Sequence, residues 1–150
     1  MNVDEKFVQA AIDLALQARR AGNHPFGALL ELNGRVLLTA MNTVNTDHDI
    51  TRHAELNLVS LASQQLDADT LAMVTLYTST EPCAMCAGAI YWAGIRRMVF
   101  GCSATKLGEI AGGEFVVPSR DVFAYGKTSI TVIGPVLAER AAEVHQGYWK

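Results

Sequence analysis

The chain carries candidate metal ligands in two separate places, and its fold must bring those places together for the ligands to act. His53 is followed two residues later by Glu55. Cys83 and Cys86 form a Cys-x-x-Cys pair directly after Pro82. Such a pair at the start of a helix can place two thiolates on one metal, and an imidazole from another helix start can supply a third ligand. The motifs therefore predict two helices whose first turns converge on one ion.

The number of ligands indicates a catalytic metal. Three protein ligands leave the fourth position of zinc open for water. Zinc can lower the pKa of that water from about 15.7 toward about 7, which makes a hydroxide nucleophile available at neutral pH. Glu55 can point into the site without binding the metal, take a proton from the water and pass it to a leaving nitrogen. The motifs thus predict a hydrolytic deamination that yields a carbonyl and ammonia.

Two other interpretations of the Cys-x-x-Cys pair stay open. A structural zinc site normally has four protein ligands, and Cys102 is the remaining cysteine. Cys102 follows an apolar run, where a small buried thiol explains it better. The other three histidines lack Cys/His spacing to a partner. A redox dithiol is the second interpretation, and it would leave His53 and Glu55 without a role.

Length and composition fit one domain over residues 1–150. Half of the 150 residues are hydrophobic, which is enough for a sizeable core. Three cysteines, two of them assigned to metal, provide no disulfide framework, and a reducing compartment suits thiolate ligands. The charged N-terminal stretch lacks the apolar region of a secretory signal, and no run reaches the roughly 18 apolar residues that span a membrane. We therefore expect a cytoplasmic protein that is not embedded in a membrane.

The charge balance favours a small-molecule substrate over a nucleic acid. Twelve Lys and Arg against fifteen Asp and Glu give a net charge of −3, so no overall positive field attracts phosphates. A local patch at Arg19-Arg20 or Arg96-Arg97 could still meet a nucleic-acid backbone. Solvated helix ends or strand edges explain both pairs as well, so a nucleic acid is the less favoured partner without being excluded.

Hydrophobic periodicity and turn signals divide the chain into helices and strands. An amphipathic helix is expected over residues 3–21, and two strands, 26–32 and 35–41, flank Asn33-Gly34, a strong type I′ hairpin signal. Residues 42–51 are expected to form a loop that delivers His53 to a helix ending near residue 65. The remaining expected elements are a strand over 73–78, a helix over 83–92, a strand over 97–101, a short helix near 104–110, a strand over 128–133 and a helix over 135–146.

This order of elements predicts an α/β fold of three layers, α/β/α, with a five-stranded mixed sheet. The strand, helix and strand around the cysteines imply a parallel, right-handed crossover. Both metal-bearing helices would begin at strand ends, where their N-termini can meet at one ion. Residues 103–128 contain several Gly and Pro breaks and are expected to be mainly loops.

With Pro25-Phe26-Gly27-Ala28 added to these motifs, the chain resembles the cytidine deaminase superfamily, in the branch of guanine, cytosine and tRNA adenosine deaminases. The resemblance covers about residues 5–105 and is most specific over residues 76–90. It implies a cytidine-deaminase-like fold that assembles as a homodimer or homotetramer. It also implies one Zn²⁺ per chain, held by His53, Cys83 and Cys86, and Glu55 as the proton shuttle.

The resemblance further implies a set of substrate contacts. An amide can donate and accept along one edge of a planar heterocycle, and a glycine would let the backbone approach the ring closely. The implied contacts are Asn42, the pocket-wall residues Phe26 and Gly27, and the backbone N–H of Ala54. An ordinary loop Asn and ordinary core residues are the alternatives.

The C-terminal third and two departures from the family pattern bear on the substrate. Glu114 or Asp121 could provide a second carboxylate, with surface charge as the alternative, and Trp149 with its neighbour Tyr148 could cap a pocket or form a docked tail. Arg52 stands where relatives more often carry a small residue, and His24 where guanine deaminases tend to carry Gly.

The leading hypothesis is a zinc-dependent hydrolase that deaminates a free nucleobase or related small heterocycle, with guanine as the first candidate and cytosine as the second. A tRNA adenosine deaminase, which forms inosine, is the alternative. A non-catalytic zinc-binding module of the same fold is a further alternative, and the intact Glu55 argues against it.

Overall fold

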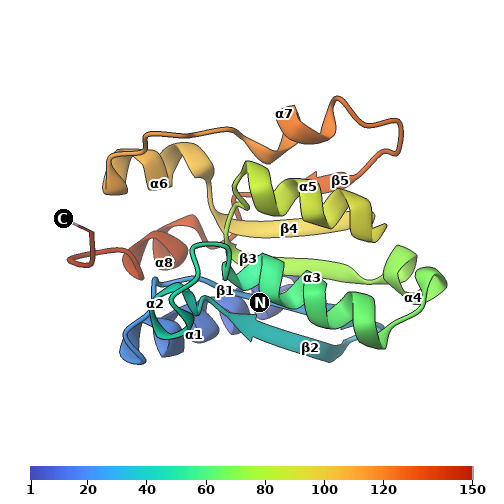
Figure 1. The fold of residues 1–150 in the computed structure, drawn as a ribbon, viewed down its shortest axis with the longest axis horizontal. Coiled ribbons are helices and arrows are strands. Elements are labelled where there is room, and N and C mark those ends of the chain that lie inside the picture. Colours follow the sequence, from blue (N-terminus) through green and yellow to red (C-terminus); the bar gives the residue numbers. More distant parts are fainter. Residues whose placement is uncertain (150) are drawn as a thin grey trace.

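A sheet of five strands forms the centre of the molecule (Figure 1). Over residues 1–149, which the computed structural model describes, the strands are β1 (Gly27–Leu32), β2 (Arg35–Met41), β3 (Thr75–Thr80), β4 (Arg97–Cys102) and β5 (Thr131–Ile133). They lie in the order β2-β1-β3-β4-β5. Strand β1 pairs antiparallel with β2 and β3, whereas β3, β4 and β5 are parallel. The predicted mixed sheet is confirmed.

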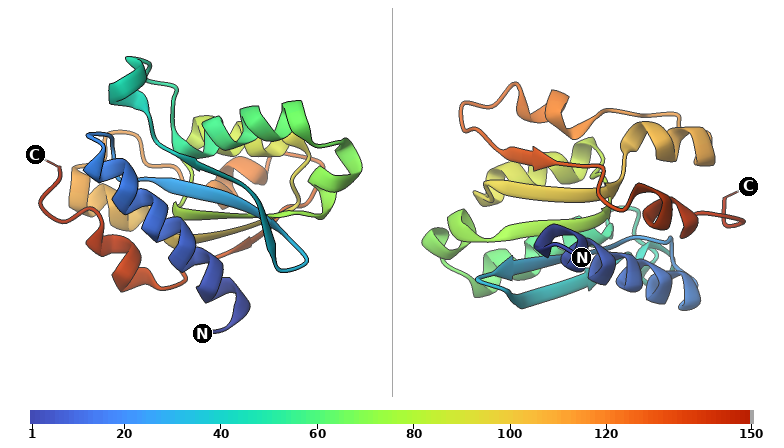
Figure 2. Two further views of the ribbon diagram at one scale, coloured as in Figure 1. Left: turned by 90° about the horizontal axis from the view of Figure 1, so that it is seen from below. Right: turned by 180° about the vertical axis from the view of Figure 1, so that it is seen from behind.

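Helices cover both faces of this sheet (Figure 2). They are α1 (Val3–Arg20), α2 (Val44–Asp47), α3 (Ala54–Gln65), α4 (Ala68–Met73), α5 (Ala84–Ala93), α6 (Ala104–Ala111), α7 (Ser119–Phe123) and α8 (Ala138–Glu143). Helices α3 and α5 run side by side on one face, and α1 and α8 pack against the other. The predicted three-layer arrangement is therefore confirmed. Among the described residues, no helix has the length and apolar character needed to cross a membrane.

Alternate residues of the central strands face opposite helix layers. In β3, Leu76 belongs to the core shared with α3 and α5, whereas Tyr77 belongs to the core shared with α1. Met98 and Val99 of β4 divide in the same way. Because side chains alternate along a strand and both faces are buried, these strands form continuous apolar runs in the sequence.

The N-terminal helix and hairpin agree with the prediction to within a residue or two. Asn2 accepts a hydrogen bond from the Glu5 N–H and the Glu5 side chain accepts one from the Asn2 N–H, which is a capping box that starts α1. Asn33 and Gly34 have φ values of 52° and 82°. Two successive positive φ angles are what a type I′ turn requires, so the hairpin prediction is confirmed.

Two helices lie where the sequence predicted other structure. Helix α2 falls in the expected 42–51 loop, where Asn23 Oδ1 accepts hydrogen bonds from the N–H groups of Asn45 and Thr46. Helix α4 ends at Met73, which was expected to begin a strand, and Asp67 caps this helix by accepting from the Thr70 N–H. Met73 is 62% exposed, so its apolar side chain was misleading.

The C-terminal third differs most from the prediction. Helix α7 forms within residues expected to be loops, strand β5 covers only the last three residues of the expected 128–133 strand, and α8 is shorter than the expected 135–146 helix. Strand β5 pairs only with Arg97, Met98 and Val99 of β4, which limits its length. The predicted short helix near residues 104–110 is confirmed as α6.

A polar network ties the start of α1 to the sheet at the edge opposite the cysteine motif. The Tyr77 hydroxyl donates to Asp4 Oδ1 at 2.6 Å, and the Arg97 guanidinium contacts both Asp4 carboxylate oxygens at 3.2 and 3.0 Å. Burial and the hydrogen bond to Asp4 raise the pKa of Tyr77 to about 12, so the hydroxyl keeps its proton at neutral pH. The network joins the start of α1 to strands β3 and β4.

Tyr77→Phe should lower the free energy of unfolding by about 1–2 kcal/mol, because it removes this hydroxyl and leaves an Asp4 oxygen with one partner fewer. Thr39→Val is the control, because it also removes a hydroxyl but at an exposed position on β2. Denaturant unfolding of the zinc-loaded protein at one fixed concentration measures both variants. Equal effects of the two substitutions would show that the hydroxyl of Tyr77 contributes nothing.

Candidate active site

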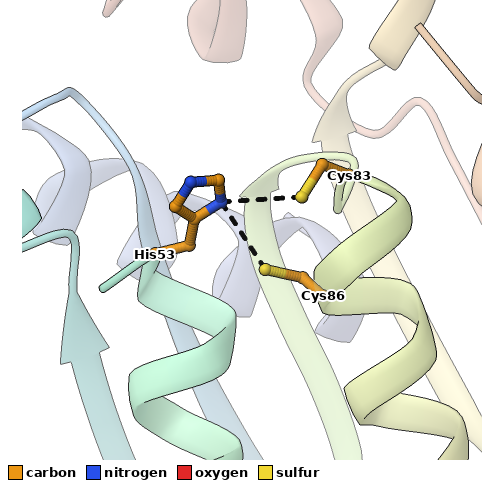
Figure 3. A group of neighbouring side chains, drawn as sticks. All are labelled: His53, Cys83 and Cys86. Atoms are coloured by element: carbon orange, nitrogen blue, oxygen red, sulfur yellow. Dashed lines mark hydrogen bonds between the residues drawn. The ribbon is translucent and has the colours of Figure 1, made fainter. Parts of the chain in front are cut away.

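The three predicted metal ligands converge at the ends of two helices (Figure 3). His53 Nδ1 lies 3.5 Å from Cys83 Sγ and 3.6 Å from Cys86 Sγ. Tetrahedral zinc with Zn–S of about 2.3 Å and Zn–N of about 2.0–2.1 Å separates its nitrogen and sulfur ligands by about 3.6 Å. The spacing of these donors therefore fits one zinc ion, and the prediction of one metal site is confirmed.

Each ligand is placed by the start of a helix. His53 occupies the N-cap position of α3 and Cys83 the N-cap position of α5, with Cys86 one turn further along α5. The partial positive charge at a helix N-terminus favours thiolate over thiol. The hydrogen bond from the Cys86 thiol, together with one from His53, lowers the pKa of Cys83 to about 4. One ligand thiol is thus ionised before any metal binds, whereas the hydrogen bond with Cys83 and burial raise the pKa of Cys86.

The donor set leaves a coordination position free. Among residues 1–149, the cluster of possible ligands consists of His53, Cys83 and Cys86, and it includes neither Glu55 nor Cys102. Cys102 is buried at the end of β4, where burial raises its pKa to about 11, as expected for an unreactive thiol. Three protein ligands are the pattern of catalytic zinc rather than of a closed structural site.

Glu55 lies beside the cluster as a buried carboxyl group. It is the second residue of α3 and is only 5% exposed. Burial, followed by the charge of the nearby Cys83 sulfur, raises the pKa of Glu55 to about 7. A carboxyl group in this range can accept and return a proton near neutral pH. This is the property that the predicted proton shuttle needs.

A small cavity adjoins the ligands. Its volume is about 110 Å³, and the residues that line it are Phe26, His53, Glu55, Glu81, Cys83 and Leu107. Pockets for drug-sized ligands usually measure about 300–1,000 Å³. The cavity is therefore suited to a small ring. A larger groove of about 560 Å³ lies between α1 and α8, but the residues that line it carry no metal ligand.

Asn42 is buried with one half of its amide unpaired. Its Oδ1 accepts a hydrogen bond from the Val44 N–H at 3.0 Å, and its backbone N–H donates to the Phe26 carbonyl oxygen. The Nδ2 atom has no hydrogen-bond partner in the described structure, although Asn42 is only 1% exposed. A buried donor without a partner costs about 1–3 kcal/mol. Asn42 is not among the residues that line the cavity, so its contact with a substrate stays a prediction.

Gly27 and Ala54 have backbone roles that the structure makes specific. A Cβ atom on Gly27 would lie 2.5 Å from Leu14 Cβ and 2.6 Å from the Ala11 carbonyl oxygen. The absence of a side chain at Gly27 therefore gives room to α1, and contact of its backbone with a substrate ring stays a prediction. Ala54 is the buried first residue of α3, where helix N–H groups lack partners within the helix.

Glu81 is a residue of the site that the sequence analysis missed. Its carboxylate accepts hydrogen bonds from the Ala104 N–H at 2.9 Å, the Ser119 N–H at 2.7 Å and the Ser119 hydroxyl at 2.6 Å. It thereby joins the loop before Cys83 to the starts of α6 and α7. The sequence shows a charged residue next to the Cys-x-x-Cys motif, which could have marked Glu81 as part of the site. Its hydrogen-bond partners could not be predicted, because they lie 23 and 38 residues away along the chain.

The remaining candidates, like Asn42, Gly27 and Ala54, are not among the residues that line the cavity. Glu114 and Asp121 are both exposed, on the α6–α7 loop and on α7, and neither belongs to the residues that line the cavity. A substrate contact from either stays a prediction. Arg52 forms an ion pair with Asp49 at 3.3 Å. Trp149 packs beside Phe26, with 6.0 Å between the ring centroids, so the C-terminal tail is docked next to the cavity wall.

Comparison with known proteins gives the same picture. Residues 1–102 match the family model described as the cytidine and deoxycytidylate deaminase zinc-binding region. A probable cytosine deaminase of Schizosaccharomyces pombe is 41% identical over 152 residues, which cover 97% of this chain and 92% of that protein. A tRNA-specific adenosine deaminase of Agrobacterium fabrum is 40% identical over 106 residues, or 68% of this chain and 70% of that protein.

A solved structure is similar along nearly the whole fold. It is described as a guanine deaminase from Nitrosomonas europaea, and it superposes with a TM-score of 0.81 at 26% identity, covering 96% of this chain and 83% of that one. The family model covers more than half of the chain and includes both predicted motifs. The chain therefore belongs to the cytidine and deoxycytidylate deaminase family, and it is a zinc-dependent hydrolase that acts on C–N bonds.

Proposed function

We propose that this deaminase acts on a free nucleobase, with cytosine as the first candidate and guanine as the second. The observation that carries the proposal is the cavity of about 110 Å³ that joins Glu55 to the metal ligands. A single six-membered ring suits that volume better than a fused purine, and a nucleoside would need further room for its sugar. The sequence analysis placed guanine before cytosine, and we propose the opposite order for this reason.

Similarity along the chain supports a free base over a tRNA as the substrate. The probable cytosine deaminase aligns over 97% of this chain, so the similarity includes the C-terminal third, whereas the tRNA deaminase aligns over 68%. Residues from that third contribute Leu107 to the cavity and place Trp149 beside Phe26. Specificity depends on a few contacts of this kind.

Glu55 moves protons in the proposed reaction, and the three ligands hold the metal. Zinc bound by His53, Cys83 and Cys86 supplies an activated water for attack on the ring carbon that bears the amino group. The Glu55 carboxylate takes a proton from that water and delivers it to the amino nitrogen, which leaves as ammonia. Its burial keeps competing bulk water away from the carboxylate.

Asn42, Ala54 and Phe26 orient the base. The unpaired Asn42 Nδ2 group donates to an acceptor on the ring, such as the carbonyl oxygen of cytosine. The Ala54 N–H, at the start of α3, is a second donor. The Phe26 ring packs against the base as one wall of the cavity. Guanine also carries an acceptor that could meet Asn42, which keeps it as the second candidate.

Two alternatives have less support. A tRNA adenosine deaminase must hold a flipped base together with its flanking phosphates, which favours a basic rim. The net charge of this chain is −3, and Arg52 is paired with Asp49, so both features argue against a basic rim. A non-catalytic zinc module would have no use for a buried carboxyl group beside the metal ligands.

Glu55→Gln should lower kcat by about 10²–10⁴-fold while one zinc per chain remains bound, because the amide cannot carry the proton and is not a ligand. Glu139→Gln, at an exposed position on α8, is the matched control and should keep full activity. Steady-state ammonia release and metal analysis of the same preparations measure both properties. Unchanged turnover in Glu55→Gln with zinc retained would favour the non-catalytic module.

Ammonia release from cytosine, guanine, adenine, their nucleosides, pterins and triazines tests the substrate. We expect the highest kcat/KM for cytosine, and a higher value for guanine would restore the order expected from the sequence. Inosine formation in a tRNA anticodon stem-loop, with salt-dependent affinity, would favour the hypothesis of a tRNA adenosine deaminase. If none of these substrates released ammonia, the proposal would be refuted.

We also propose that two copies associate through the outer face of α5. Trp92 and Tyr125 are 85% and 94% exposed, and an apolar hollow of about 210 Å³ lies beside them between α5 and α7. Exposed apolar patches of this kind mark interaction sites. A second copy of the chain is the occupant that the predicted homodimer requires.

Trp92→Glu should shift the sedimentation coefficient of the zinc-loaded protein toward that of a monomer, because the charge would be buried in the interface without a partner. Met73→Glu is the control, since Met73 is exposed on α4, outside this patch. A monomeric wild-type protein at micromolar concentration would contradict the proposed dimer.

A further inference from the structure

His145 is a buried side chain that the proposed reaction does not use. It follows α8 and is fully buried. One ring nitrogen, Nε2, lies 2.9 Å from the Thr80 hydroxyl at the end of β3, and the other, Nδ1, lies 3.1 Å from the indole Nε1 of Trp149. The imidazole therefore bridges the strand that leads to Cys83 and the C-terminal tail.

The partners of His145 determine its tautomer. An indole N–H can donate a hydrogen bond but cannot accept one, so Nδ1 must carry a lone pair. The ring proton then lies on Nε2 and is donated to the Thr80 hydroxyl. Burial, with a smaller contribution from the nearby Arg19 guanidinium, lowers the pKa of His145 to about 4. The neutral ring that both hydrogen bonds require is thus the form present at neutral pH.

The tail is fixed on its other side by α1. The Arg19 guanidinium donates to the carbonyl oxygens of Val144 and Gln146 at 2.9 and 2.7 Å, and it lies 5.5 Å from the Tyr148 ring centroid. His24 meets the edge of Trp149 at 5.2 Å between ring centroids. These contacts give the tail one defined position instead of a loose one.

The bridged rings pack against a wall of the cavity. The Phe26 ring centroid lies 5.3 Å from that of His145 and 6.0 Å from that of Trp149. Phe26 lines the cavity, whereas His145 and Trp149 are not among the residues that line it. The tail therefore reaches the site of reaction through Phe26.

We propose that His145 is a positioning residue: by joining Thr80 to Trp149 it holds the tail against Phe26 and so sets the width of the cavity that receives the base. The kinetic consequence rests on the proposed function, because it concerns binding of a base. The tautomer and the bridge do not depend on which base is turned over.

The kinetic test separates positioning from catalysis. His145→Ala and Trp149→Ala should each raise KM for the preferred base about tenfold with little change in kcat, because a displaced wall weakens binding without touching the reacting atoms. His145→Asn should recover most of the loss, since its amide oxygen can accept from the Trp149 indole. His48→Asn is the matched control, at an exposed left-handed position that Asn adopts readily.

Nuclear magnetic resonance of the zinc-loaded protein gives a readout that does not require turnover. We expect the Nε2–H tautomer for His145 at pH 7 and slow solvent exchange of the Trp149 indole N–H, compared with the same N–H in His145→Ala, where its acceptor is lost. Trp149→Phe should leave the tail ring in place but abolish this protected signal. An Nδ1–H tautomer, or an unchanged KM in both alanine variants, would overturn the proposal. A correct tautomer without activity on any base would instead count against the proposed function.

Discussion

The meeting of two helix N-termini at one point is the constraint on which the rest of the structure depends. His53 and Cys83 hold the N-cap positions of α3 and α5, and neither side chain caps its own helix. A Ser, Thr, Asp or Asn at such a position would contribute about 0.5–2 kcal/mol to the helix. The chain gives up that stabilisation twice so that both positions can present metal ligands. The partial positive charge at each helix N-terminus then favours the thiolate form of the cysteine ligands.

The motif is held in position by residues far from it in the sequence. Glu81 connects the loop before Cys83 to the starts of α6 and α7 through three hydrogen bonds. On the other side, Thr80 meets His145 after α8. The C-terminal third therefore supports a site whose ligands all lie in the first two thirds. The family model ends at residue 102, so these supporting contacts from α6, α7 and the tail lie outside the matched region.

The sequence predicted those parts of the structure that are specified locally. The Asn33-Gly34 turn and the capped helix α1 depend on nearby residues and are confirmed. The cluster of His53, Cys83 and Cys86 is also confirmed, although 30 residues separate His53 from Cys83, because the residue types themselves indicate metal ligands. Helix α7 could not be predicted, because a buried carboxylate 38 residues earlier accepts from its first N–H group.

The strand was wrongly predicted to begin at Met73 because this residue is apolar, whereas its side chain is exposed at the end of α4. The sequence also does not reveal that α1 fills the space where a Cβ atom of Gly27 would lie. The contacts of Asn42, Phe26 and Ala54 with substrate stay predictions, because no bound base defines them.

Zinc X-ray absorption spectroscopy of the purified protein tests the central claim most directly. An open three-ligand site predicts two sulfur ligands at about 2.3 Å and two nitrogen or oxygen ligands at about 2.0–2.1 Å, of which one is an imidazole and one is exchangeable solvent. Cys102→Ala should leave that spectrum unchanged. A first shell with three sulfur ligands, or with four ligands that all come from the protein, would contradict the account.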